Sequence, residues 1–480
     1  MTETAPVSPP PPARAALRRV MKQRDVVLFL IAAVVGTRWI ATAAAVGPSS
    51  LVIWLIGFLA LFVPLAFTVF ELSSRYPEEG GLYVWIRRAF GDYAGFLSGW
   101  MYWASNLTYF PGLLYFSAAS LLFMFGAHGH GWSGNVTYYV VASLAGLALT
   151  LILNLVGLNV GKWLPNAGAI GTWIPVGLLV AAGFIACARF GSATAFTPRS
   201  FLPGTHLQDL VLWSTIAFAF GGIESASFLS EEIEDAARTI PRAIVLAGVS
   251  ITAIYVLGTL AVLLALPRSE VSGLQGIMQA TERAGARIGA PWITPVSALL
   301  TAIGGLGGVA AWLASNGRLT FVAGVDRYLP PAFGRLHPRW GTPHVALIVQ
   351  GVGAGVFTLM SQAGTGVQGA YDALVSMTVI AYFIPLLLLF AAMIALQREP
   401  APAGALLTPG GKPVAILMGA LGIATTFVSM ILAALPPGDS KDPRLAVAKV
   451  IGGTLIVLLA GTLLYAGGKR RLRRQSVEGR

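Results

Sequence analysis

Long apolar runs, with charged residues confined to short clusters between them, constrain this chain more than any other feature. Of its 480 residues, 56% are hydrophobic and 11% are charged, against roughly 25% charged in an ordinary globular domain. A helix needs about 20 predominantly apolar residues to cross a bilayer, whereas membrane β-barrels show short alternating segments. The runs begin near Val26, Leu51, Tyr93, Val136, Ala167, Leu210, Ala243, Trp292, His344, Ala370, Pro413 and Leu445. We therefore predict an all-α membrane protein with about twelve transmembrane helices.

The net charge of +12 follows membrane topology. If the N-terminus is cytoplasmic, most Lys and Arg residues fall on segments that face the cytoplasm, from residues 14–24 to the cluster at 469–480. This is the distribution that the positive-inside rule describes. We expect a multi-pass protein of the inner (cytoplasmic) membrane with both termini cytoplasmic, in contact with membrane lipids and not with nucleic acid.

Glycines interrupt two of the apolar runs at matched positions. Gly36 interrupts the first run, and Gly221 with Gly222 interrupts the sixth. Many secondary transporters consist of two inverted halves of five helices, and the first helix of each half is broken at the membrane midplane, where substrate binds. The spacing therefore predicts a transporter whose site lies between the two breaks. Close helix packing, the usual role of glycine in membrane helices, is the alternative for each glycine.

Three motifs resemble one family of membrane transporters. They are residues 220–227 (FGGIESAS) with 238–243 (RTIPRA), residues 71–85 (ELSSRYPEEGGLYVW), and residues 316–319 (NGRL) with 326–330 (DRYLP) and 337–343 (HPRWGTP). Together they resemble the amino acid–polyamine–organocation transporter superfamily. The resemblance implies a leucine-transporter-like core of two inverted five-helix repeats plus two accessory helices. Residues 83–87 and the first span look most like the glutamate/γ-aminobutyrate antiporter group.

The resemblance also implies a division of the chain. Residues 1–22, with four consecutive prolines at 9–12, are expected to form a disordered cytoplasmic tail. Residues 23–396 would form the inverted-repeat transport core and residues 397–468 the two accessory helices. Residues 469–480 would form a basic cytoplasmic tail. The function implied is secondary active transport of amino acids by alternating access, as a permease or antiporter.

Glu224 is the acidic residue best placed to act within a span. An ionisable group inside a membrane is costly and marks a functional site by default. In related antiporters the glutamate of a Gly-x-Glu motif couples transport to protons, so the resemblance implies a coupling or gating role. The alternative is a structural glutamate that is hydrogen-bonded to neighbouring backbone or to Ser225 and Ser227.

Arg38 departs from the family's pattern. The first break usually reads Gly-Ser/Thr-Gly, followed by an apolar residue and an aromatic one, whereas residues 35–39 here read VGTRW. An arginine stays charged, so its burial demands a partner. Three roles remain open for Arg38: a bidentate bond to the substrate carboxylate, an ion pair with Glu224, or a position in an aqueous vestibule without substrate contact.

The other candidate residues lie at the breaks and on the third and tenth spans. Phe218 occupies the position where relatives carry an aromatic gate over the substrate, and Asn106 could bond either substrate or a neighbouring helix. The predicted substrate-binding residues are Val35, Gly36, Thr37, Arg38, Trp39, Asn106, Phe218, Gly221 and Gly222, with Glu224 and Phe218 for proton coupling or gating. Weaker candidates are Tyr102 and Phe110, which share a helix face with Asn106, and Tyr371, Ser376 and Tyr382; Trp312 is expected to pack.

Other classes of protein are disfavoured. Five histidines and one cysteine make a metal site or an embedded enzyme a poor fit, and a Walker-type loop is absent. We expect no metal and no cofactor. The fifth span lacks the lysine that replaces a sodium ion in some relatives, and sodium coupling is not supported. Arg38 favours an acidic amino acid as substrate, with a polyamine or other organic amine as the alternative. Uniport, symport, exchange and a homodimer stay open.

Overall fold

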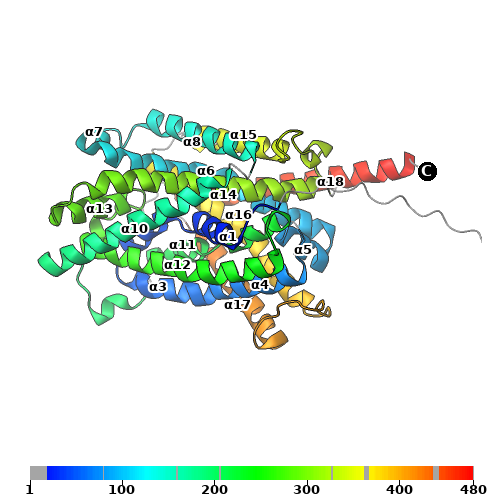
Figure 1. Cartoon of the computed structure of the whole chain (residues 1–480), viewed down its shortest axis with the longest axis horizontal. Helices are drawn as coiled ribbons and strands as arrows, with labels where there is room; N and C mark the ends of the chain where they lie inside the picture. The colour runs from blue at the N-terminus through cyan, green and yellow to red at the C-terminus, as the bar shows by residue number, and fades with distance from the viewer. Residues whose placement is uncertain are drawn as a thin grey trace, which may run out of the picture.

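The computed structural model describes residues 19–78, 80–157, 161–204, 207–325, 328–361, 367–435 and 443–478. Within these residues the fold is a bundle of helices, and strand pairing is limited to one isolated bridge between Met21 and Ile233. Most of the long helices run along the long axis of the molecule (Figure 1).

The elements follow one another in this order: α1 (Gln23–Val34), α2 (Thr37–Val46), α3 (Ser49–Gly57), the π-helix η1 (Phe58–Phe62), α4 (Val63–Arg75), α5 (Leu82–Phe90), α6 (Asp92–Leu122), η2 (Phe123–Phe125), α7 (Gly126–His130), α8 (Val136–Val156), α10 (Trp163–Phe190), η3 (Pro198–Phe201), α11 (Leu207–Ala219), η4 (Ile223–Glu232), α12 (Ala236–Ala265), η5 (Arg268–Glu270), α13 (Gly276–Arg287), α14 (Ile293–Val325), η6 (Pro331–Gly334), α15 (His344–Ser361), α16 (Val367–Leu396), α17 (Gly411–Ala433) and α18 (Pro443–Glu478).

The predicted membrane fold is confirmed. Ten helices in the described residues are long and apolar enough to cross a membrane, and the bent pair of α1 and α2 gives an eleventh. In α15 the apolar segment His344–Met360 is shorter. Each of the twelve expected starting positions falls inside a helix or, for Trp292, one residue before it. The all-helical class therefore follows from the sequence, while the count of twelve spans stays a prediction.

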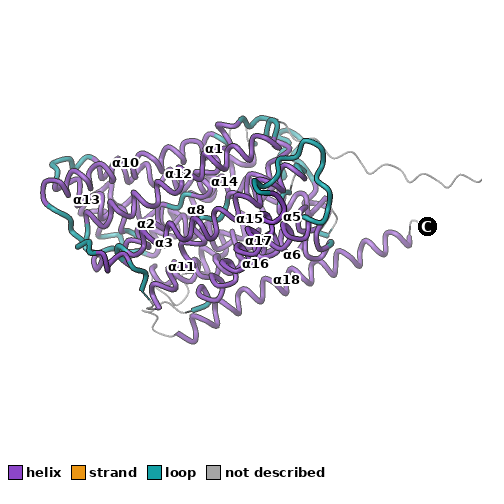
Figure 2. The backbone as a smooth tube through the Cα atoms, turned by 90° about the horizontal axis from the view of Figure 1, so that it is seen from below, coloured by secondary structure: helices purple, strands orange, loops and turns teal. Residues whose placement is uncertain are grey.

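The most deeply buried of the long helices lie in the middle of the bundle. Nine-tenths of the apolar windows in Asp92–Phe125 and Leu212–Glu232 are buried (89% each), against 33% for Gly411–Ala433 and 17% for Val450–Arg474. Figure 1 places α1 at the centre, with α8 and α15 along one edge and α3 and α17 along the other. In Figure 2, α18 runs along the outside, and its C-terminal end extends beyond the bundle.

Glycine brings α10 and α14 into close contact beside the first helix break. A Cβ atom added at Gly168 would lie 2.7 Å from the Cα of Gly307, and one added at Gly308 would lie 3.0 Å from the carbonyl oxygen of Ala32. Small residues at a helix interface let membrane helices approach closely. Such close packing stabilises the pair, because in lipid there is no hydrophobic effect to hold two helices together. The tight packing of α14 against α10 and α1 follows.

A buried ion pair fixes η4 to α14. Arg318 donates from Nε to Oε2 of Glu232 at 2.7 Å and from Nη2 to Oε1 at 3.2 Å, and the two side chains are only 1% and 7% exposed. The backbone N–H groups of Val20 and Met21 donate to the carbonyl oxygen of Glu232 at 2.9 and 3.0 Å. The start of α1 and the end of η4 are therefore held together.

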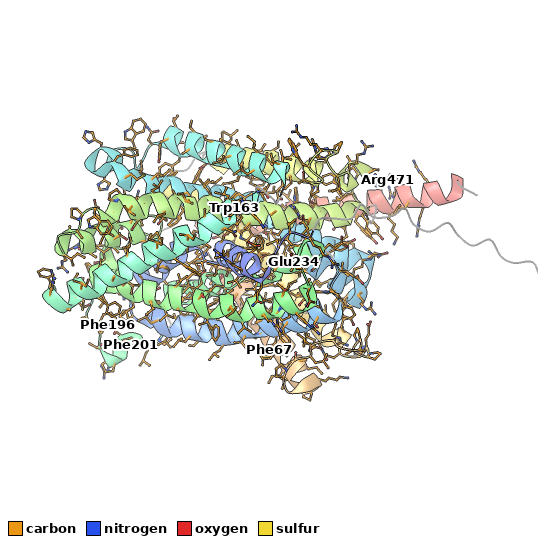
Figure 3. All side chains as sticks on the ribbon, viewed as in Figure 1. Phe67, Trp163, Phe196, Phe201, Glu234 and Arg471 are labelled. Carbon is orange, nitrogen blue, oxygen red and sulfur yellow. The ribbon has the colours of Figure 1, made fainter. Side chains whose placement is uncertain are left out.

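The loop that carries Phe196 and Phe201 lies at the opposite end of the bundle from Arg471 of α18 (Figure 3).

Removing one partner of this pair is expected to destabilise the protein strongly. Arg318→Met leaves the Glu232 carboxylate buried without its cation, a change that costs about 3–5 kcal/mol in buried pairs. The measurement is the thermal unfolding of purified protein. Arg283→Met, which removes the partner of Glu270 from an exposed pair, is the matched control and should change the melting temperature little. Equal losses in the two variants would contradict this role for the buried pair.

Candidate functional site

The first break lies between α1 and α2, as predicted. The two helices are bent by 43°, and Val35 and Gly36 between them have extended backbone (ψ 98° and 99°). A Cβ atom at Gly36 would lie 2.5 Å from Nε1 of Trp39. A side chain at position 36 would therefore push against the Trp39 indole, which folds back over the break.

The second break separates α11 from the 3₁₀ helix η4, and its two glycines have different tasks. Gly222 has φ of +117°, a conformation that L-residues with a side chain rarely adopt. A Cβ atom at Gly221 would lie 2.4 Å from the Tyr382 hydroxyl oxygen. One glycine therefore allows the turn of the chain and the other allows a tyrosine of α16 to approach the break.

Arg38 lies in the first turn of α2 and is 1% exposed. Its guanidinium carbon lies 4.1 Å from the ring centroid of Trp39 and 4.8 Å from that of Tyr109, so both rings contribute cation–π attraction. A Cβ atom at Gly112 would come within 3.2 Å of Arg38 Nη1. The N-terminus of α2 also carries partial positive charge, which makes a cation costly and an anion favourable at this position.

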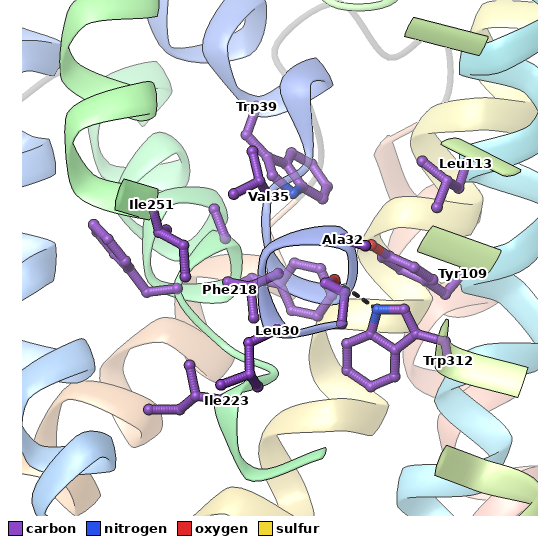
Figure 4. Packing of buried hydrophobic residues seen from close by; sticks show 14 of the residues in the cluster. Leu30, Ala32, Val35, Trp39, Tyr109, Leu113, Phe218, Ile223, Ile251 and Trp312 are labelled. Carbon is purple, nitrogen blue, oxygen red and sulfur yellow. Dashed lines mark hydrogen bonds between the residues drawn. The ribbon is translucent and has the colours of Figure 1, made fainter. Parts of the chain in front are cut away.

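Aromatic side chains from five elements enclose the space between the breaks. Trp39 contacts Phe218 edge to face with centroids 5.6 Å apart, and Phe218 contacts Tyr382 in the same way at 5.2 Å. Tyr109 lies 5.6 Å from Trp312, and Figure 4 shows these two rings on one side of α1. The predicted gate residue Phe218 is therefore at the centre of an aromatic enclosure. Whether it moves during transport stays a prediction.

Trp312 does more than the packing expected of it. Its indole Nε1 donates a hydrogen bond of 2.7 Å to the carbonyl oxygen of Ala33, in the last turn of α1. That carbonyl has lost its helical partner because α1 ends one residue later. Neither Trp312 nor Tyr109 carried a signal in the sequence beyond being an aromatic residue in an apolar run.

Glu224 ties three elements together. Its Oε1 atom accepts hydrogen bonds from the hydroxyl groups of Tyr102 on α6 and Tyr382 on α16, both at 2.6 Å. Its Oε2 atom accepts from the Gly222 N–H at 3.1 Å. Hydrogen bonds to a carboxylate are roughly twice as strong as neutral ones. This cluster therefore fixes η4 to α6 and α16.

The structure does not bring Arg38 and Glu224 together. Arg38 lies beside Gly112, whereas Glu224 is bonded to Tyr102, ten residues earlier on the same helix. At a rise of 1.5 Å per residue, the two levels differ by about 15 Å along α6. In this conformation the two charges lie at opposite ends of the aromatic enclosure.

The remaining candidates have simpler surroundings. The Asn106 amide donates to the carbonyl oxygen of Tyr102 at 3.0 Å, a bond within its own helix. Thr37 lines a small cavity beside the first break, together with Tyr109 of α6, Thr172 of α10 and Gly305 of α14. Ser376 is half-buried on α16, and the side chain of Tyr371 lies outside the described residues. Among the described residues no three His, Cys, Asp or Glu side chains could hold a metal ion.

Two helices broken inside a membrane-embedded bundle, with the backbone of both breaks close together, are the arrangement in which many secondary transporters bind their substrate. The chain belongs to the amino acid permease family, whose sequence profile matches residues 22–459. The predicted superfamily is thereby confirmed.

Named relatives agree with this assignment. An uncharacterized transporter of Legionella pneumophila is 30% identical over 452 residues, covering 92% of this chain and 95% of the relative. The "Probable agmatine/putrescine antiporter" of Lactococcus lactis is 23% identical and covers 94% of both chains. A glutamate/γ-aminobutyrate antiporter of Lactococcus lactis is 22% identical and covers 87% of this chain and 85% of its own.

A solved structure shows the same fold. The crystal structure of MhsT in complex with L-phenylalanine superposes with a TM-score of 0.59 at 14% sequence identity, covering 94% of this chain and all of MhsT (100%). The leucine-transporter-like architecture expected from the sequence is confirmed by this likeness.

The hydrogen bonds of Glu224 lead to a test by a double-mutant cycle. Tyr382→Phe leaves the carboxylate with one bond fewer, which we expect to cost about 1–3 kcal/mol. In a Glu224→Gln background the same substitution should cost less, because the acceptor is no longer charged. Thermal unfolding of the four proteins measures the coupling.

Tyr115→Phe is the control for this cycle, since it removes a tyrosine hydroxyl of α6 that donates to the carbonyl oxygen of Thr358. Its effect should add to that of Glu224→Gln, as expected for distant sites. Additive effects of Tyr382→Phe and Glu224→Gln would show that the tyrosine does not act on the carboxylate.

Proposed function

We propose that this permease carries an amino acid across the cytoplasmic membrane by alternating access, with the substrate held between the two helix breaks and its carboxylate bound by Arg38. The observation that carries the proposal is the burial of Arg38 in the first turn of α2, directly after the break. A buried guanidinium is costly inside a membrane protein. Its position directly after the first break, in the first turn of α2, is what makes it our candidate receptor for an anionic group.

Both the chemistry of the chamber and the relatives support an amino acid. A planar carboxylate can accept two parallel hydrogen bonds from a guanidinium, and the α2 N-terminus adds partial positive charge on the same side. Carbonyl groups freed at the second break would accept the ammonium group. We favour an acidic amino acid because Arg38 adds a positive charge directly after the first break. One relative is a glutamate/γ-aminobutyrate antiporter.

A polyamine or other organic amine is the second candidate. It is supported by the similarity to the "Probable agmatine/putrescine antiporter". A dication in the chamber would face repulsion from Arg38, but it would be attracted by Glu224 at the other end. The two candidates differ in which of the two buried charges dominates substrate binding.

Glu224 is proposed as the group that couples transport to protons or to exchange. If both termini are cytoplasmic, as the sequence predicts, the start of α6 faces the cytoplasm. The bonds from Glu224 to Tyr102 and Tyr382 would then close the site on that side. Protonation would weaken these charge-assisted bonds. The closed side would then open more readily when Glu224 carries a proton.

Transport by purified protein in liposomes tests the substrate. We expect uptake of radiolabelled L-glutamate, and Arg38→Gln should raise the KM for it about tenfold to a hundredfold, because bonds to a charged group contribute about 1.5–3 kcal/mol. Arg283→Gln, which removes an exposed arginine of α13, is the control and should leave uptake unchanged. Uptake of amines alone, insensitive to Arg38→Gln, would contradict the assignment.

The coupling role of Glu224 is tested by the pH dependence of uptake. Wild-type protein should transport faster at acidic than at neutral pH, because protonation releases the two tyrosines. Glu224→Gln should show a nearly flat profile, since its side chain cannot lose or gain a proton in this range. A variant that keeps the wild-type pH profile would show that another group carries the proton.

A further inference from the structure

One tyrosine hydroxyl bonds to the backbone of both helix breaks. Tyr255 on α12 is fully buried, and its hydroxyl oxygen lies 2.8 Å from the carbonyl oxygen of Val34 and 2.9 Å from that of Ala219. The same oxygen accepts a hydrogen bond of 3.2 Å from the Gly36 N–H. The single hydroxyl proton is therefore shared between two carbonyl groups that belong to different broken helices.

These three backbone groups are among those that the breaks leave without helical partners. Val34 is the last residue of α1 and Ala219 the last of α11, while Gly36 immediately precedes α2. Carbonyl groups in the last turn of a helix and N–H groups at the start of one have no partner within it. Inside a membrane each unsatisfied group costs several kcal/mol. Tyr255 thus supplies a hydrogen-bond partner to the backbone of both breaks from a third helix.

The phenol ring is held rigidly. It stacks on Trp54 of α3 with centroids 4.3 Å apart and planes 13° apart, and Phe220 meets it edge to face at 5.6 Å. The Trp54 indole donates to the Thr259 hydroxyl at 2.9 Å, and Thr259 lies one turn beyond Tyr255 on α12. In Figure 4, Ile251, one turn before Tyr255, lies on the opposite side of α1 from Trp312.

We propose that Tyr255 is a positioning residue that links the movements of the two breaks. Its hydroxyl oxygen also accepts the hydrogen bond of the Gly36 N–H, so that this amide is not available to the substrate. Its hydroxyl keeps Val34, Gly36 and Ala219 in one arrangement, so the two half-helix ends shift together when the chamber opens. Because the Gly36 N–H already has an acceptor, a substrate carboxylate is directed to the Arg38 side chain. This second consequence rests on the proposed function, whereas the coupling of the breaks does not.

Hydrogen–deuterium exchange on the purified full-length protein tests the coupling without any ligand. Tyr255→Phe keeps the ring contacts and removes the hydroxyl. We expect amide exchange to rise about fivefold in peptides covering residues 33–39 and also in those covering 217–225, the factor that corresponds to a hydrogen bond of ~1 kcal/mol. Tyr138→Phe, which removes a hydroxyl that donates to the carbonyl oxygen of Ala118, should change neither region.

Two outcomes would overturn the coupling. Faster exchange at one break alone would make Tyr255 a local cap, and unchanged exchange at both would remove its role. Thr259→Val provides a milder variant if Tyr255→Phe does not fold, because it frees only the Trp54 indole beneath the phenol. It should raise exchange at both breaks by a smaller factor, and no change at either would equally contradict the proposal.

The effect on carboxylate recognition is tested by kinetics with L-glutamate as the probe. In Tyr255→Phe the Gly36 N–H becomes available, so Arg38→Gln should raise the KM by a smaller factor in that background than in wild-type protein. A purely structural tyrosine would lower the maximal rate of both proteins and leave the KM ratio unchanged, which would contradict the proposal. Absence of L-glutamate uptake by wild-type protein would refute the proposed substrate and leave the exchange experiment intact.

Discussion

Where a helix is broken inside a membrane, the N–H and C=O groups at the break lose their helical partners. When the break is buried in protein, other groups of the protein must replace those partners. The rest of this site depends on how that requirement is met at two places. At the first break, Trp312 binds the carbonyl group of Ala33 and Tyr255 binds Val34 and Gly36. At the second, the Gly222 N–H binds Glu224. The side chains of Trp312, Tyr255 and Glu224 are thus held in place by the backbone groups that they bind at the two breaks.

The positions of the two buried charged side chains, Arg38 and Glu224, would determine the orientation of a bound substrate. Glu224 holds two tyrosines from α6 and α16 at one end, while Arg38 lies between two aromatic rings at the other. An amphoteric substrate fits such a field in only one orientation, with its anionic group toward Arg38. The carboxylate that closes one end is also a group that can take up a proton. On the proposed function, substrate binding at Arg38 and closure at Glu224 act on the same pair of broken helices.

Much of the fold was predictable because it follows from patterns local in sequence. Apolar runs located the helices, and the paired glycines located the breaks, since both signals arise within a few residues. Glu224 was identified because an acid inside a span is rare. The partners of the breaks were not predictable. Tyr255 and Trp312 lie more than 200 residues from the first break, and an aromatic residue in an apolar run looks the same whether it packs or donates. Asn106, by contrast, was favoured for its polarity and bonds to its own helix.

The central claim is that substrate binds between the two breaks with its anionic group on Arg38. A structure of the protein determined with a transported amino acid bound tests it most directly. The account predicts a carboxylate within hydrogen-bonding distance of the Arg38 guanidinium, enclosed by Trp39 and Phe218, while the Gly36 N–H remains bonded to Tyr255. A substrate whose carboxylate is bound by the Gly36 amide, with Arg38 turned away, would contradict it.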